Sequence, residues 1–134
     1  LVGKLSRRES LMKPLSLALF VLTTISLNAQ QNQLCKGNPK VVDQCFKIHG
    51  RVRVVNGAGT VIWHIGTDRL LEVEDEELIP DNLGKAMYKK AGDVYGSDVF
   101  GDFEVCPFTK SKEGEMQMVC VESASHLVVK DNTH

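Results

Sequence analysis

Basic or titratable side chains occupy every second position of one short segment, residues 46–54. They are Lys47, His49, Arg51 and Arg53. Because side chains two positions apart in a strand lie on the same face, this basic stripe would present one row of cations. An arginine guanidinium can hold a carboxylate or a phosphate through two parallel hydrogen bonds. The stripe is therefore the candidate site for an anionic ligand, such as a polysaccharide carboxylate, a phosphate or a lipid headgroup.

An ordinary solvated sheet face is the competing interpretation of the basic stripe. Its cations would then pair with acids on a neighbouring strand, such as Asp102 and Glu104. That pairing is expected if the first and fourth strands are neighbours, as they are in a small five-stranded Greek-key barrel. The two interpretations differ in whether Arg51 and Arg53 are free or already neutralised by acids.

Trp63 is the one tryptophan of the chain and the next candidate for ligand contact. An exposed indole ring can stack on a sugar or a base. Trp63 nevertheless alternates in step with Val61 and Ile65, which is typical of residues that share the inner face of a strand. The pattern predicts that Trp63 lies in the core.

Histidines and an acidic run are the candidates for metal binding. His49, His64 and His126 could ligate an ion, but a site needs a third ligand and the spacing places none. The acidic run at 72–77 lacks the pattern of a calcium-binding loop. No nucleophile elbow, phosphate-binding loop or zinc-protease motif occurs in the sequence. We expect a protein that is not an enzyme and that has no cofactor and no metal site.

Four cysteines, Cys35, Cys45, Cys106 and Cys120, predict two disulfides, since an even count is typical of short exported chains. The sequence contains no Cys-x-x-Cys pair, so the cysteines do not have the spacing of a zinc site. A loop tip near Glu113 would place Cys106 opposite Cys120 in a hairpin, which favours a Cys106–Cys120 bond and leaves Cys35–Cys45. A barrel would instead favour Cys45–Cys106 with Cys35–Cys120. The sequence does not choose between the pairings.

An export signal is predicted near the start of the chain. Lys13 follows Met12, which we interpret as the natural start, and residues 15–27 form a short apolar run that ends near Ala29. The alternative is a long basic segment that includes residues 1–11. A basic segment, a short apolar run and a small residue form the pattern of a cleavable secretory signal. The run is shorter than the roughly 20 apolar residues that span a bilayer. We expect cleavage to leave a mature protein that begins near Gln30.

The mature segment would carry 12 Lys and Arg against 16 Asp and Glu, a net charge of −4. Nucleic-acid-binding domains usually carry a net positive charge, so we expect no nucleic-acid partner. Cys35 lacks the small preceding residues of a lipoprotein signal. The expectation is a periplasmic or secreted protein with no membrane span in its mature part.

Hydrophobic alternation and turn residues predict the order of elements in the mature segment. Three strands come first, then a short helix, then two strands, the last with a bulge near 123–125 and an extension. Their expected bounds are 46–54, 60–65, 69–73, 81–91, 99–105, 116–122 and 127–129. This order predicts a mainly β fold, a small Greek-key barrel of five antiparallel strands like the oligonucleotide/oligosaccharide-binding (OB) fold, with the helix between strands three and four. The expected divisions are an extension with the signal at 1–29, an irregular lead-in at 30–44 and one domain at 45–134.

One apolar layer should fill this barrel. The residues expected in it are Phe46, Ile48, Val52, Val61, Ile65, Leu71, Phe103, Val105, Val119 and Val121.

Several segments resemble those of a family of small exported bacterial proteins of uncharacterised function. They are His49-Gly50-Arg51, Asn56-Gly57, Ile62-Trp63, Ile65-Gly66-Thr67 with Arg69, Gly101-Asp102-Phe103-Glu104-Val105-Cys106-Pro107, and Val119-Cys120-Val121-Glu122-Ser123-Ala124. The resemblance extends from about Cys45 to Val129 and implies a single domain type without a known activity.

The sequence thus favours an exported, non-enzymatic binding or interaction module that holds an anionic envelope ligand on its basic stripe. The alternative is a structural or accessory domain that only docks to a larger protein. A small hydrolase is a more distant third, because no motif supports one.

Overall fold

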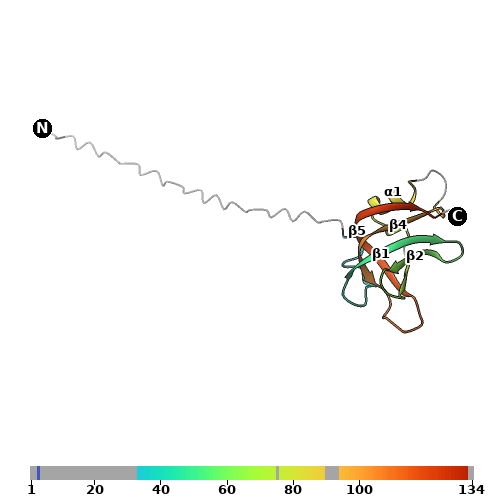
Figure 1. Ribbon diagram of the computed structural model, residues 1–134. Coiled ribbons are helices and arrows are strands. Elements are labelled where there is room, and N and C mark those ends of the chain that lie inside the picture. Colours follow the sequence, from blue (N-terminus) through green and yellow to red (C-terminus); the bar gives the residue numbers. More distant parts are fainter. Residues whose placement is uncertain (1–2, 4–32, 75, 90–93, 133–134) are drawn as a thin grey trace.

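The computed structural model of the 134-residue chain describes residue 3 and residues 33–74, 76–89 and 94–132. The predicted export segment, apart from Gly3, and the predicted mature start near Gln30 lie outside the described residues. The described residues form one small β-rich unit, shown in Figure 1.

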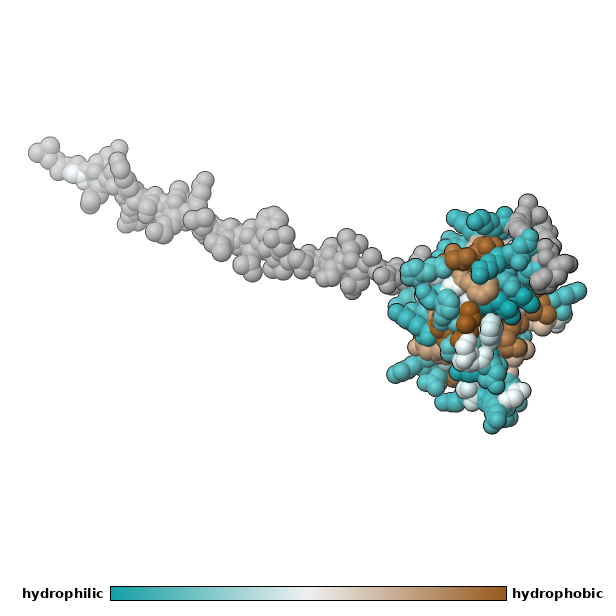
Figure 2. Space-filling view, viewed as in Figure 1, coloured by the Kyte–Doolittle hydropathy of each residue, from teal (hydrophilic) through white to brown (hydrophobic). Residues whose placement is uncertain are grey.

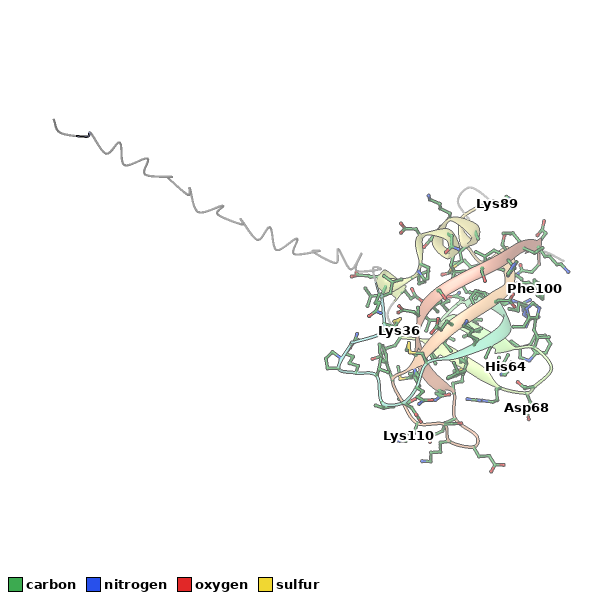
Figure 3. All side chains as sticks on the ribbon, turned by 90° about the vertical axis from the view of Figure 1, so that its left-hand side faces the viewer. Lys36, His64, Asp68, Lys89, Phe100 and Lys110 are labelled. Carbon is green, nitrogen blue, oxygen red and sulfur yellow. A yellow bond between two sulfur atoms is a disulfide. The ribbon has the colours of Figure 1, made fainter. Side chains whose placement is uncertain are left out.

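Five strands, one short α-helix and one 3₁₀ helix make up this unit. They are β1 (Phe46–Val55), β2 (Gly59–His64), β3 (Leu70–Val73), η1 (Glu76–Leu78), α1 (Asp81–Met87), β4 (Ser97–Pro107) and β5 (Gln117–Asp131). The strands are hydrogen-bonded in a closed, barrel-like ring in the order β1-β2-β3-β5-β4. The predicted mainly β fold, with five strands and the helix between the third and fourth, is confirmed. Figure 3 shows Lys89, just after α1, and Lys110, in the β4–β5 loop, at opposite ends of the ring.

The ring contains one parallel pair, between β3 and β5, where Leu71 lies opposite Gln117 and Val73 opposite Val119. The expectation that every pair would be antiparallel is therefore wrong. Strand direction alternates in an antiparallel sheet, and five strands cannot alternate all the way around a closed ring. The odd strand number requires one parallel junction, and it falls at short β3.

The core follows the alternation of β1, β4 and β5 as predicted. One cluster of buried side chains contains seven of the expected residues, Ile48, Val52, Leu71, Phe103, Val105, Val119 and Val121, with Phe46 packed against it. Leu83 and Met87 of α1 join the same cluster. The helix therefore covers one side of the core.

The prediction for β2 is wrong by one position. Ile62 is fully buried in the core. Val61 is buried as predicted but lies on the outer face, outside the core cluster, as does half-buried Trp63, and half-buried Ile65 lies beyond the strand. The cause is Thr60, a buried polar residue whose hydroxyl and backbone N–H both donate to the Glu76 carboxylate. A hydrogen-bonded hydroxyl can be buried at little cost, so polar Thr60 takes an inner position.

The two disulfides join the lead-in to the end of the ring. Cys35 is bonded to Cys120, and Cys45 to Cys106. Cys106 and Cys120 do lie opposite each other in the β4–β5 register, as the hairpin argument required. The pairing that this argument favoured, Cys106–Cys120 with Cys35–Cys45, is nevertheless wrong, and the barrel-based pairing is right.

The path of the lead-in explains this pairing. Its described residues, 33–44, form no regular element and run over the outer side of β4 and β5 as far as Cys45. Val42 N–H donates to the carbonyl of Pro107, and Lys36 N–H donates to the carboxylate of Glu122. Leu34 and Val41 pack with the four half-cystines and Phe108 in a second small core. Each end of the lead-in thus meets one strand cysteine.

The helix is shorter than expected, ending at Met87, and the predicted end at Ala91 lies outside the described residues. β5 is longer than expected because it continues through the predicted bulge region. Two irregularities interrupt the β4–β5 register, one between Glu104 and Val105 and one between Phe100 and Asp102. The second places an extra β5 residue next to His126, which has a positive φ of 52°. The bulges flank the predicted segment, 123–125.

We predict that Gly50→Ala lowers the free energy of unfolding by about 1–3 kcal/mol, as overpacking of a core does. Gly50 lies opposite Gly101, and a Cβ atom on it would lie 2.9 Å from Cγ2 of Ile62 and 3.3 Å from Cδ2 of Phe103. Denaturant unfolding checks the prediction.

Gly84→Ala is the matched control. A Cβ atom there would meet no heavy atom within 4 Å among the described residues, and Gly84 lies inside α1. This change should stabilise the protein by about 0.5–1 kcal/mol, the usual helix preference for alanine. Equal effects of the two substitutions would contradict the packing described at Gly50.

Candidate functional site

All four residues of the basic stripe lie on the outer face of β1, as predicted. Lys47 and His49 are exposed and Arg51 and Arg53 are half-buried, while the residues between them point into the core. Their neighbours on the adjacent strands follow from the register. One row of outward side chains crosses the sheet in the order Val128, Phe100, Arg51, Trp63 and Leu70. Figure 3 labels Phe100 of this row.

Arg53 is neutralised by Asp98 of β4. Its Nε and one terminal nitrogen donate to the two carboxylate oxygens over 2.7 and 2.6 Å. Asp98 is only 6 % exposed and also accepts a hydrogen bond from the Asn132 amide. The hydrogen bonds from Arg53, followed by that from Asn132, hold the pKa of the Asp98 carboxyl below its ordinary value. Charge pairing of the stripe thus holds at Arg53, with an acid that the sequence had not singled out.

Arg51 shares the same carboxylate more loosely. Its Nε lies 3.9 Å from Asp98 Oδ2, and this buried atom has no hydrogen-bond partner among the described residues. The guanidinium instead lies over the Trp63 ring, 5.0 Å from the ring centroid. Guanidinium groups stack favourably on indole rings, and stacking leaves the edge of the guanidinium available for hydrogen bonds. One carboxylate therefore faces two guanidiniums and binds one of them fully.

A groove of about 290 Å³ lies beside Arg51 and Trp63 on the outer face of β1, β2 and β3. It is lined by Arg51, Arg53, Val55, Ala58, Val61, Trp63, Leu70 and Met116. The predicted core position of Trp63 is thus wrong. Because the side chain of Ile62 points into the core, the side chains of Val61 and Trp63 on either side of it point outward. Val55, Leu70 and Met116 are 40–44 % exposed. Figure 2 shows one face of the molecule, on which small apolar patches lie among hydrophilic side chains.

Two of the four predicted residues line the groove and two do not. Arg51 and Arg53 line it, whereas Lys47 and His49 lie further along β1. His49 Nδ1 is 2.9 Å from Asp102 Oδ1, so the expected pairing with Asp102 is confirmed. Glu104 instead forms an ion pair with Lys36 of the lead-in, although it lies opposite Lys47 in the register.

One group in the described part of the chain has potential metal-ligating atoms that all lie within 4.8 Å of one another, and it consists of Cys35, Cys106 and Glu122. Both cysteines are bonded in disulfides. The Glu122 carboxylate accepts hydrogen bonds from the backbone N–H groups of Cys35 and Lys36. These residues hold the lead-in in place and are not free to bind a metal ion.

Sequence reasoning missed Asp98, Phe100 and the apolar side of the groove. Asp98 and Phe100 carried a usable signal, because they share the alternation of outward Asp102 and Glu104 in β4. Leu70 and Met116 carried no such signal. They lie at the start of β3 and just before β5, and only the ring closure brings them together.

The chain matches no protein-family model, no curated protein and no solved structure. The predicted resemblance to small exported bacterial proteins therefore stays a prediction. Two disulfides fit an oxidising compartment, either extracellular or periplasmic. Among the described residues, no helix has the length and apolar character needed to cross a membrane.

We predict that Asp98→Asn lowers the free energy of unfolding at pH 7 by about 1–2 kcal/mol, because Arg53 loses a charge-assisted partner. The pKa of Asp98 is lowered in the folded state, so its stabilisation is present above the unfolded value of about 3.9 and disappears as the pH falls through the folded value. The difference between the variant and the wild type should shrink below about pH 4.

Denaturant unfolding between pH 2.5 and pH 7 measures this difference. Asp68→Asn, in an exposed turn, is the control and should leave the pH profile unchanged. A constant gap between wild type and Asp98→Asn across the whole range would contradict the assigned role of the carboxylate.

Proposed function

We propose that this protein is an exported, non-enzymatic binding module whose ligand joins an anionic group to an apolar body. The ligand lies in the groove between Arg51, Trp63 and Met116. One observation carries the proposal. Arg51 is stacked on Trp63 at the wall of an apolar groove, and its partner Asp98 is already engaged by Arg53.

The chemistry of the groove supports two-part recognition. The edge of a stacked guanidinium can donate two parallel hydrogen bonds to a carboxylate or a phosphate. Val55, Val61 and Leu70 offer apolar contact a short distance away, and burial of apolar area contributes about 25 cal/mol per Å². A purely ionic ligand would use only the first part and a neutral lipid only the second. An amphiphilic anion uses both.

Export and envelope location belong to the same proposal. The predicted signal, the mature net charge of −4 and the two disulfides are consistent with a periplasmic or secreted protein. The negative net charge makes any attraction of anions local to the groove, so nucleic acid is not the expected ligand. The strand order β1-β2-β3-β5-β4 resembles that of the OB fold, and this resemblance supports a ligand site on the sheet surface around strands 2 and 3.

Docking to a larger protein is the second candidate function. The exposed side chains of Val55, Leu70 and Met116 favour it, since clustered apolar residues on a surface are typical of interaction sites. In that case the groove would receive a partner's apolar side chain rather than a free amphiphile.

We predict that the protein binds octyl phosphate and decanoate below their micelle-forming concentrations, and that Arg51→Gln weakens this binding by about tenfold or more. Isothermal titration calorimetry measures both. Lys47→Gln is the matched control, because it removes the same charge from the same face of β1 outside the groove. Its affinity should stay within about twofold of wild type.

Two comparison ligands divide the recognition into its parts. Inorganic phosphate and octyl glucoside should each bind more weakly than octyl phosphate, because each lacks one part of the ligand. Equal losses in Arg51→Gln and Lys47→Gln would show unspecific charge attraction and overturn the proposal. Absence of binding by the wild type would leave protein docking as the better function.

A further inference from the structure

Two histidines approach one carboxylate on the outer face, away from the groove. Nδ1 of His49 lies 2.9 Å from Oδ1 of Asp102, and Nδ1 of His126 lies 3.0 Å from Oδ2 of the same residue. The side chains of His49, His126 and Asp102 are 60, 83 and 52 % exposed. They come from three neighbouring strands, β1, β5 and β4.

The backbone brings this trio together in two ways. His49 lies directly opposite Asp102 in the β1–β4 register. On the other side, Asp102 pairs with Ser125, and the irregularity that follows places His126 beside it. His126 has a φ of 52°, a left-handed conformation that few residues other than glycine adopt. Bulges often re-aim a side chain, and this one directs an imidazole toward Asp102.

We propose that His49, Asp102 and His126 form a binding site for a divalent transition-metal cation, Zn²⁺, Cu²⁺ or Ni²⁺. Two imidazole nitrogens and a carboxylate oxygen are the ligand set that such ions accept. Ca²⁺ and Mg²⁺ prefer oxygen ligands alone and should not compete. Spacing along the chain provided no third ligand for His49, whereas the fold provides two partners, Asp102 and His126.

The ligand atoms of the trio do not all lie within 4.8 Å of one another, so a shared ion requires side-chain rotation. Neighbouring strands lie about 4.8 Å apart, so the two histidines start about 10 Å from each other with the carboxylate between them. They now contact different oxygens of that carboxylate. An ion needs both rings to turn toward it, and their high exposure leaves room for this rotation. Water would complete the coordination.

The pH dependence of binding follows from the ligands. A metal ion binds the neutral imidazole and competes with protons for it. Binding should therefore weaken as the pH falls from 7.5 to 5, because protons displace the metal ion from the imidazole nitrogens. Besides the trio, Lys47 and Arg51 of β1 and Glu104 of β4 are the charged residues two positions away along the same faces. Glu104 is paired with Lys36.

Isothermal titration with Zn²⁺ at pH 7.5 tests the site. We expect one equivalent to bind, and His49→Gln, His126→Gln and Asp102→Asn each to weaken binding by about tenfold or more, as loss of a ligand or its orienting carboxylate does. His64→Gln is the control, since His64 lies opposite Gly50 on the inward side of the β1–β2 pair, outside the trio. Its affinity should equal that of wild type.

The site is independent of the proposed groove, so its test does not depend on the function proposed for Arg51. Wild-type affinity in His126→Gln, with the fold intact by circular dichroism, would overturn the proposal, as would binding of Ca²⁺ with equal strength. Absence of Zn²⁺ binding by the wild type at pH 7.5 would overturn it as well. Binding lost at pH 5 and regained at pH 7.5 supports it.

Discussion

Closure of five strands into one ring is the constraint on which the rest of the structure depends. The ring gives every strand one inner and one outer face, and its odd number of strands requires the parallel junction between β3 and β5. The inside accepts only side chains that pack, so Gly50 and Gly101 lie opposite each other where a larger residue would meet Ile62 or Leu127. Charged residues of β1 consequently all face outward. Closure also brings Leu70 and Met116 to one groove although they lie far apart in the chain.

The buried carboxylate of Asp98 determines which arginine of the outer face is fully paired. A buried carboxylate needs partners, because an uncompensated buried charge is costly. Arg53 supplies two hydrogen bonds and Asn132 a third, which leaves Arg51 with a weaker contact and a stacked position on Trp63. Pairing with acids therefore accounts for part of the basic stripe, and the ligand-site interpretation stays a proposal for Arg51. Pairing with acids describes Arg53 and His49, whereas Arg51 remains the cation best placed to meet an anionic ligand.

The sequence predicted those parts of the fold in which one physical pattern acts alone. β1 and β4 alternate cleanly between apolar and polar residues, and their faces and pairing were predicted correctly. β2 was not, because Val61, Ile62 and Trp63 are all apolar and the inner face was decided by the hydrogen bonds of Thr60 to Glu76. The disulfide pairing depended on the path of the irregular lead-in. No hydrophobic periodicity in that segment predicts its path. The approach of His126 to Asp102 depended on a bulge, whose exact position local sequence does not specify.

Quenching of tryptophan fluorescence by iodide and by caesium tests whether Arg51 is an available cation beside Trp63, because Trp63 is the only tryptophan of the chain. The Trp63 ring lies on the outer face under a guanidinium that is not fully neutralised. At equal, low ionic strength, iodide should quench Trp63 more strongly than caesium, despite the expected net charge of −4, and Arg51→Gln should remove the difference. Equal quenching by both ions in the wild type would contradict an incompletely neutralised cation beside Trp63. The absence of quenching by either ion would contradict the place of Trp63 on the outer face.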